Sequence, residues 1–150
     1  MKKYLIILIF GLTGSIMNKT MAQQTPAVLN HIAVYVGDLK KSTDFYESLF
    51  NLKIIPEPFK DGKHTWFSLG NGSALHLIEG AKSGQVYDRN DHLCFSISSI
   101  EDFIKKLQTQ KISYGDWGGK TGAINVRVDG VKQIYFQDPD GHWLEVNNAR

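Results

Sequence analysis

An internal repeat constrains the fold of this chain more than any other feature of its sequence. The segment NHIAVYVGDLKKSTDFYESL, which starts at Asn30, aligns without gaps with DHLCFSISSIEDFIKKLQTQ, which starts at Asp91. A second pair, WFSLGNGSALHLIE from Trp66 and YFQDPDGHWLEVNN from Tyr135, aligns in the same way. The shift is 61 residues for the first pair and 69 for the second, so the second copy carries eight extra residues before its last hairpin. The repeat predicts two copies of one structural unit.

The hydrophobic pattern of the first copy predicts a strand, a helix and three more strands. Apolar residues alternate over residues 28–39, which indicates a strand. A single apolar stripe over residues 40–52 indicates a helix and consists of Phe45, Leu49 and Leu52. The runs KIIPEPF, HTWFSLG and SALHLIEG are typical of strands.

The second copy repeats this order. Residues 91–97 have a strand pattern and residues 98–110 a helical one, which begins with Ser98 and Glu101 at the spacing of a capping box. The last strand contains Glu145. Three short strands are predicted in between, near residues 112–114, 124–128 and 131–137.

Both copies are therefore βαβββ units. The sequence predicts one domain over residues 28–148, with modules at 28–80 and 90–148. We expect an α+β fold in which the two modules pair to form a cupped mixed β-sheet with the helices on its outer face.

The first 22 residues have the order of a secretory signal peptide. Lys2 and Lys3 precede an apolar run that ends near Met17, and Ala22 offers a small residue for cleavage. The run is short for a membrane span, which needs about 20 residues. We expect removal of residues 1–22, export to the periplasm or the medium, and no membrane contact by the mature chain. The alternative is an uncleaved N-terminal anchor.

The charge of the chain limits the kinds of partner that it can bind. The formal net charge is +2 for the whole sequence. Removal of the leader takes away Lys2, Lys3 and Lys19, which leaves 14 basic and 15 acidic residues and a net charge of −1. No long basic cluster remains, so we expect a small-molecule partner and no nucleic acid.

Four residues with metal-binding side chains occupy equivalent positions in the two copies. His31 aligns with His92 on the first strands, and His76 aligns with Glu145 on the last strands. Strand alternation places each of the four opposite the strongly apolar side, which would pack under the helices. If the modules pair about a pseudo-twofold axis, the four side chains converge on one point. Imidazole and carboxylate suit Zn²⁺, Fe²⁺, Mn²⁺, Co²⁺ or Ni²⁺, so the pattern predicts one divalent ion.

Three further side chains are expected to lie outside the ligand set, although His142 is close enough in sequence to touch the rim of the site. Cys94 is the single cysteine, so no internal disulfide forms, and we expect it to be a small buried side chain. His64 begins a predicted strand and His142 lies in a predicted turn, and both are expected to face solvent.

Taken together, the two units resemble the vicinal oxygen chelate superfamily, which includes glyoxalase I, fosfomycin-resistance and bleomycin-resistance proteins, methylmalonyl-CoA epimerase and extradiol dioxygenases. The resemblance rests on NHIAVYVGDLKKSTDFYESLF, DHLCFSI and QIYFQDPDGHWLEVN and covers residues 29–147. It implies a divalent metal held by His31, His76, His92 and Glu145, with coordination sites open for vicinal oxygens of a substrate. Modules in this superfamily pair within one chain or swap between the chains of a homodimer. Glyoxalase I usually has Glu at the position of His76, so the reaction is less defined than the family.

The resemblance favours a metal-dependent enzyme that moves a proton next to a carbonyl group, as an isomerase, epimerase or lyase on a small carbonyl or hydroxy compound. The metal would act as a Lewis acid, and Glu145 is the predicted catalytic base. The glycine-rich segment 114–128 also carries Lys120, which with Arg127 is a candidate for holding an anionic group. The residues predicted to bind substrate are Tyr35, Trp117, Arg127, Trp143 and Asn147.

Two other function classes remain open. The His/His/carboxylate set also resembles that of an Fe(II) ring-cleaving dioxygenase. The second class is metal-free binding and sequestration of a small molecule such as an antibiotic, for which a set of convergent metal ligands is unnecessary.

Overall fold

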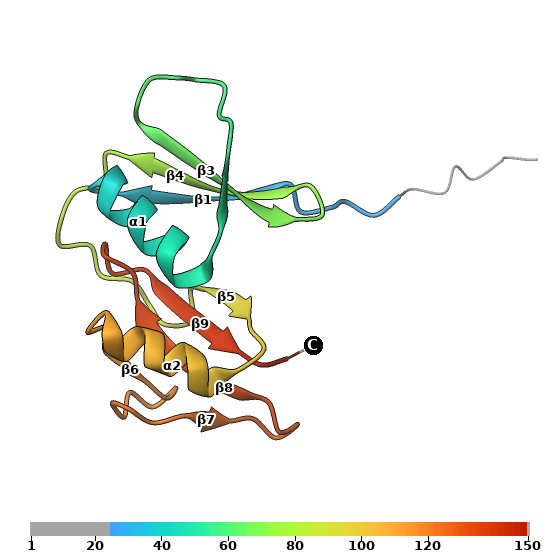
Figure 1. The fold of residues 1–150 in the computed structure, drawn as a ribbon, viewed down its shortest axis with the longest axis vertical. Coiled ribbons are helices and arrows are strands. Elements are labelled where there is room, and N and C mark those ends of the chain that lie inside the picture. The colour runs from blue at the N-terminus through green and yellow to red at the C-terminus, as the bar shows by residue number, and fades with distance from the viewer. Residues whose placement is uncertain (1–24, 150) are drawn as a thin grey trace, which may run out of the picture.

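The computed structural model describes residues 25–149, which form two modules placed one above the other (Figure 1). The predicted signal peptide lies outside the described residues. Module 1 consists of β1 (His31–Val36), α1 (Leu39–Phe50), β2 (Lys53–Ile55), β3 (His64–Gly70) and β4 (Ser73–Glu79). Module 2 consists of β5 (His92–Ser96), α2 (Ile100–Thr109), β6 (Tyr114–Gly115), β7 (Asn125–Val126), β8 (Lys132–Gln137) and β9 (Trp143–Asn147). Neither of these helices is long and apolar enough to cross a membrane.

Each module has its own mixed sheet. The strand order is β1-β4-β3-β2 in module 1 and β5-β9-β8-β6 in module 2, where β7 also pairs with β8. The first strand of each module runs parallel to the last, and the other pairs are antiparallel. The predicted α+β fold of two paired modules is confirmed, with the strands divided between two sheets. Both β1 and β5 are edge strands, so each leaves one row of backbone groups unpaired within its sheet.

Each helix begins at a polar cap. The Asp38 carboxylate accepts a hydrogen bond from the backbone N–H of Lys41 at the start of α1. In α2 the cap is Ser99, whose hydroxyl accepts from the backbone N–H of Asp102. The predicted capping box that starts at Ser98 is therefore wrong by one residue. The side chain of Glu101 instead pairs with Lys132, 2.6 Å away, in the neighbouring sheet.

The two helices cover the same side of the molecule, and a single hydrophobic core lies beneath them (Figure 1). Phe50, the last residue of α1, joins the modules in this core. Its ring stacks on Phe95 of β5 with the centroids 4.2 Å apart, and it also contacts Phe103 of α2 and Phe136 of β8. Because the core uses one side of each sheet, the opposite sides are left for other contacts.

The turn between β8 and β9 fastens module 2 to the start of α1. The Asp138 carboxylate accepts a hydrogen bond from the Tyr46 hydroxyl at 2.9 Å. Asp140 accepts from the Ser42 hydroxyl at 2.9 Å and from the backbone N–H of Gly37 at 2.8 Å. The acidic residues of the DPDGH motif are thus used for contact between the modules, not for chemistry on the opposite sheet face.

Candidate metal centre

The sheet face of module 1 that points away from the helices carries a stack of three aromatic rings. The imidazoles of His31 and His76 are parallel, with centroids 4.4 Å apart. The indole of Trp66 lies parallel to His76 at 3.8 Å. Burial lowers the pKa of His76, and the neighbouring His31 lowers it further, so its imidazole is neutral at physiological pH and has a free lone pair.

The equivalent face of module 2 carries a buried carboxylate. Glu145 is only 6% exposed, and its Oε2 atom lies 3.4 Å from Nε2 of His92. Tyr135 donates a hydrogen bond to Oε2 at 2.7 Å. Asn147 and Cys94 donate to Oε1 at 2.8 and 3.2 Å. Three donors therefore fix the orientation of one carboxylate beside one imidazole.

These contacts set the charge states of the centre. Burial raises the pKa of Glu145, but the bonds from Tyr135, Asn147 and Cys94 outweigh it, so the pKa lies below its ordinary value. The carboxylate is therefore ionised at neutral pH. Partial burial and the adjacent Glu145 raise the pKa of Cys94 to about 12. The pKa of Tyr135 is raised by burial and by the same carboxylate, so both donors keep their protons.

The histidine tautomers suit metal ligation. Nδ1 of His92 lies 2.7 Å from the backbone carbonyl oxygen of Arg89, which only accepts hydrogen bonds, so Nδ1 carries the proton. Nδ1 of His31 lies 2.8 Å from Oδ1 of Asn30 in the same manner. With Nδ1 engaged in this way, Nε2 is the ring nitrogen that each histidine would offer to a metal, which is the orientation that hydrogen-bond acceptors impose on ligating histidines. The donor types and the ring orientations therefore fit a divalent ion.

The structure brings the four predicted ligands together as two pairs. His31 lies with His76 in module 1, and His92 lies with Glu145 in module 2. Within residues 25–149 no group of three or more His, Cys, Asp or Glu side chains is close enough to hold a metal ion. One chain therefore supplies two half-sites, and the assignment of the four ligands stays a prediction.

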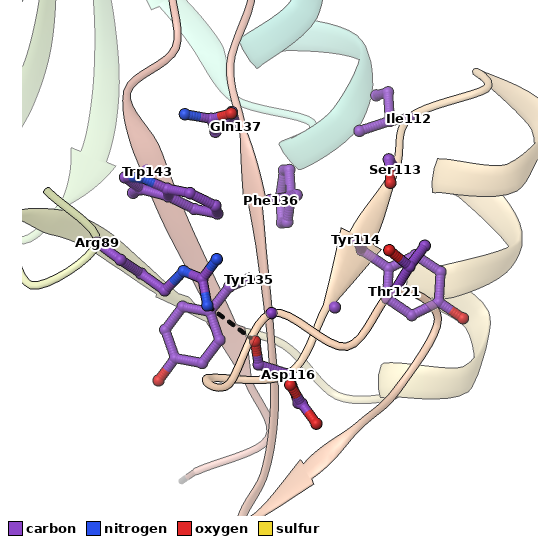
Figure 2. A pocket seen from close by; sticks show the side chains of 12 residues that line it. Arg89, Ile112, Ser113, Tyr114, Asp116, Thr121, Tyr135, Phe136, Gln137 and Trp143 are labelled. Atoms are coloured by element: carbon purple, nitrogen blue, oxygen red, sulfur yellow. Dashed lines mark hydrogen bonds between the residues drawn. The ribbon is translucent and has the colours of Figure 1, made fainter. Parts of the chain in front are cut away.

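A cavity of about 300 Å³ in module 2 is lined in part by Tyr135, which also bonds to Glu145, and Figure 2 shows the lining. The Arg89 guanidinium lies over the Trp143 ring, 4.2 Å from the ring centroid. It also donates to the backbone carbonyl oxygens of Asp116 and Trp117. Arg89 thus ties the loop after β6 to β9, and Trp143, predicted to bind substrate, lines this cavity.

The other residues predicted to bind substrate lie in different places. The Trp117 side chain is 44% exposed and meets Tyr135 edge to face. Tyr35 is exposed on the same side of β1 as His31. Asn147 is buried, and its side-chain amide donates a hydrogen bond to Glu145, so in this chain it positions the carboxylate. The Arg127 guanidinium pairs with Asp129 at 2.6 Å, so its charge is already partnered.

Three expectations about side-chain environment are wrong. Cys94 is exposed as a residue, although its Sγ atom lies against Glu145 and Asn147 of β9 and is partly buried there. His64 is half-buried and its Nδ1 lies 2.9 Å from Asp61. His142 is half-buried and its Nδ1 lies 2.9 Å from Asp138.

Sequence reasoning missed Tyr135 and Trp66, which touch the predicted ligands. The signal was present in the repeat, because the shift of 69 residues that aligns His76 with Glu145 also aligns Trp66 with Tyr135. In the sheets, Trp66 is the cross-strand partner of His76, and Tyr135 is the partner of Glu145. Arg89 was also missed, and its position before β5 carries no pattern that predicts its contacts.

Comparison with known proteins places this geometry in a family. The sequence profile of the Glyoxalase/Bleomycin resistance protein/Dioxygenase superfamily matches residues 28–146. The chain is 33% identical over 125 residues to the Metallothiol transferase FosB of Bacillus licheniformis, covering 81% of this chain and 75% of that protein. It is 26% identical over 127 residues to Glyoxylase I 4 of Arabidopsis thaliana, covering 81% and 70%.

Solved structures agree with these matches. Oxidase ChaP-H2 superposes with a TM-score of 0.69 at 25% identity, over 84% of this chain and 96% of that one. The fosfomycin resistance protein FosX of Listeria monocytogenes superposes with a TM-score of 0.66 at 25% identity, over 84% and 96%. The matched profile covers both modules, including all four predicted ligands. The chain therefore belongs to the Glyoxalase/Bleomycin resistance protein/Dioxygenase superfamily.

Proposed function

We propose that this protein is a divalent-metal-dependent enzyme of the glyoxalase type, which transfers a proton next to a carbonyl group of a small oxygen-rich substrate. The observation that carries the proposal is the His92–Glu145 pair, in which three donors fix an ionised carboxylate 3.4 Å from Nε2 of an imidazole whose Nδ1 is held by a backbone carbonyl. The relatives named metallothiol transferase and glyoxylase support an enzyme.

The metal centre is completed by a second copy of the chain. Protein sites for transition metals use three or four protein ligands, and each module supplies two. The first ligand of each pair lies on an edge strand, His31 on β1 and His92 on β5. In a homodimer with swapped modules, β1 of one copy lies next to β5 of the other, which brings His31 and His76 to His92 and Glu145. Such an isologous pairing creates two equivalent sites.

The chemistry follows from the residues that surround the carboxylate. A bound divalent ion would supply Lewis-acid stabilisation of negative charge on a substrate oxygen. Glu145 is ionised and buried, so it accepts a proton from the carbon next to the carbonyl and returns it to a neighbouring atom. Tyr135 and Asn147 hold the carboxylate oxygens in place while the proton moves. The buried position of Glu145 keeps bulk water from competing for that proton.

A subunit-complementation experiment tests the shared centre. His31→Ala and His92→Ala should each abolish binding of Co²⁺, which is followed by visible absorption and by elemental analysis. When the two variants are mixed and allowed to exchange subunits, half of the dimers are mixed, and each mixed dimer has one intact site. Co²⁺ binding should then return to about a quarter of the wild-type value. No recovery in dimers that demonstrably exchange would contradict a centre shared between copies.

An Fe(II) oxygenase is the second candidate, because two histidines and one carboxylate form the ligand set that suits Fe(II) oxygen chemistry. The two candidates differ in whether oxygen is consumed. Protein loaded with Zn²⁺ or Ni²⁺ should catalyse solvent proton exchange without oxygen. Activity that requires Fe(II) and consumes oxygen in an electrode cell would instead favour the oxygenase.

We also propose that the protein is exported. Support comes from the charged, apolar and small-residue order of the first 22 residues. Mass spectrometry of protein from its native cells should find a mature chain that begins at Gln23. An intact N-terminus in a soluble cytosolic pool would contradict export.

A further inference from the structure

A hollow on the sheet face of module 1 adjoins the His31–His76 pair. It has a volume of about 510 Å³ and is lined from all four strands of the sheet and from the loop after β2. Pockets of 300–1,000 Å³ are typical of small-molecule sites. Because two predicted metal ligands form part of its wall, a molecule bound there extends to the metal centre.

One wall of this pocket is aromatic. The Trp66 indole stands between His76, stacked on it at 3.8 Å, and Phe59, whose ring meets it nearly at a right angle with centroids 6.1 Å apart. Phe59 also packs on His64 at 4.6 Å and is 59% exposed. A large aromatic side chain left in solvent at the rim of a hollow gains burial when an apolar molecule enters.

Other residues that line the pocket are small. Ala33 on β1 and Gly72 and Ala74 near β4 leave the space that the rings enclose. The lining contains no Asp, Glu, Lys or Arg. The indole Nε1 of Trp66 is buried without a hydrogen-bond partner, so an oxygen acceptor that reaches it would satisfy a costly unpaired donor.

We propose that this pocket binds the flat aromatic body of the substrate, one or two fused rings that carry an oxygen acceptor, while the substrate's vicinal oxygens point to the metal centre. The inference rests on the proposed function only for the metal-bound end of the substrate. Aromatic walls without charge favour an aromatic ligand through stacked and edge-to-face contacts. The volume leaves room for more than a three-carbon carbonyl compound.

Binding of 2-naphthol to metal-free protein tests this inference apart from the metal. The compound has one oxygen and does not chelate, so its binding reports the pocket alone. We expect one saturable site per chain, measured by calorimetry and by quenching of tryptophan fluorescence. Decahydro-2-naphthol, which keeps the hydroxyl but has no flat ring, should bind about tenfold more weakly or worse.

Two variants locate the site. Ala33→Phe adds a ring to an exposed position of the pocket and should weaken 2-naphthol binding about tenfold or more. Phe59→Ser, on an exposed loop, should weaken it several-fold. Val126→Phe adds similar bulk to exposed strand β7 of module 2 and is the matched control; it should leave the affinity unchanged. Circular dichroism checks the fold of each variant.

The outcomes separate this inference from the proposed function. Absence of saturable 2-naphthol binding, equal binding of the saturated analogue, or equal affinity in all three variants would overturn the aromatic pocket. Any of these results combined with Co²⁺ binding that needs His31 and His92 would leave the metal-dependent enzyme in place. Naphthol binding with no Co²⁺ binding would overturn the metal centre and leave the pocket standing.

Discussion

The two modules carry different kinds of side chain at one equivalent row of positions across their sheets. In module 1 the row across the sheet runs Ile55, Trp66, His76, Ala33, and in module 2 the equivalent row runs Gly115, Tyr135, Glu145, Cys94. The first row is apolar apart from its imidazole and indole nitrogens, and the rings of Trp66 and His76 stack. The second row is polar, and its members exchange hydrogen bonds around a carboxylate.

The difference shows how one repeated fold divides the work of a site. A carboxylate held by three donors is a suitable metal ligand and proton acceptor. A ring stack beside small residues is a suitable surface for an apolar group. Gly115 is part of the same difference between the modules. A Cβ atom at this position would lie 2.7 Å from the carbonyl oxygen of Lys120. The glycine lets the loop of module 2 approach, whereas Ile55 at the equivalent position fills a wall of the pocket in module 1.

The largest expected effect comes from replacing the ligand of each module at the equivalent position. Glu145→Gln should retain some Co²⁺ affinity, because an amide oxygen still coordinates, and should lose turnover by about 10² to 10⁴-fold. His76→Ala should weaken Co²⁺ binding and leave residual turnover at saturating metal. Turnover of both variants is measured as solvent deuterium exchange next to the carbonyl of 2-hydroxy ketones and 2-keto aldehydes. Glu145→Gln with bound metal and wild-type turnover would remove Glu145 as the base.

A second pair of variants tests hydrogen bonding against stacking. Tyr135→Phe removes the donor to Oε2 of Glu145 and should weaken Co²⁺ binding or activity by about 10 to 100-fold. Trp66→Phe, at the equivalent position, keeps an aromatic ring beside His76 and should leave Co²⁺ affinity nearly unchanged. Titration of Co²⁺ by visible absorption distinguishes them. Equal losses in the two variants would mean that the modules do not differ as described.

Cys94 provides a smaller and direct test of the buried carboxylate. With its pKa raised to about 12, from an ordinary value of 9.0, the thiolate fraction at neutral pH falls about 10³-fold. Higher intrinsic nucleophilicity offsets part of this loss, so alkylation by iodoacetamide should be about 30-fold slower than for an ordinary thiol. The matched control is Ala33→Cys in a Cys94→Ala background, which places a thiol at the equivalent position of module 1. Equal alkylation rates in the metal-free proteins, followed by mass spectrometry, would contradict the assigned environment.

The smallest effect concerns the hydrogen bonds of Asp138 and Asp140 that join module 2 to α1. Burial and the Asp138 carboxylate raise the pKa of Tyr46 well above its ordinary value. The native state therefore keeps the phenol protonated where the unfolded chain ionises, and this contribution to stability is present below about pH 10 and is lost as pH rises further. Tyr46→Phe should lower the free energy of unfolding by about 1 kcal/mol near neutral pH and make its decline in alkali shallower. Urea unfolding at about pH 7 and about pH 10.5 measures both. An unchanged alkaline slope would show that Tyr46 does not titrate on unfolding.

The sequence by itself determined the modules, the strands that carry the four predicted ligands and the side of each strand on which they lie. It did so because alternation has a period of two and because the repeat requires His31 and His92, or His76 and Glu145, to occupy equivalent places. The residue at which α2 begins was less well determined by the sequence, since Ser98 and Ser99 are both good caps and only the backbone angles select Ser99.

Only the tertiary structure decided what surrounds those residues. The bonds of Tyr135 and Asn147 to Glu145, the stack of Trp66 on His76 and the exposure of Cys94 all depend on neighbours from other strands and on which faces stay uncovered. The separation of the ligands into two pairs depends on how the modules pack. The shared core at Phe50 and the hydrogen bonds of Asp138 and Asp140 determine that packing. These contacts join residues far apart in the chain, and a periodic pattern specifies the direction of a side chain without specifying its partner.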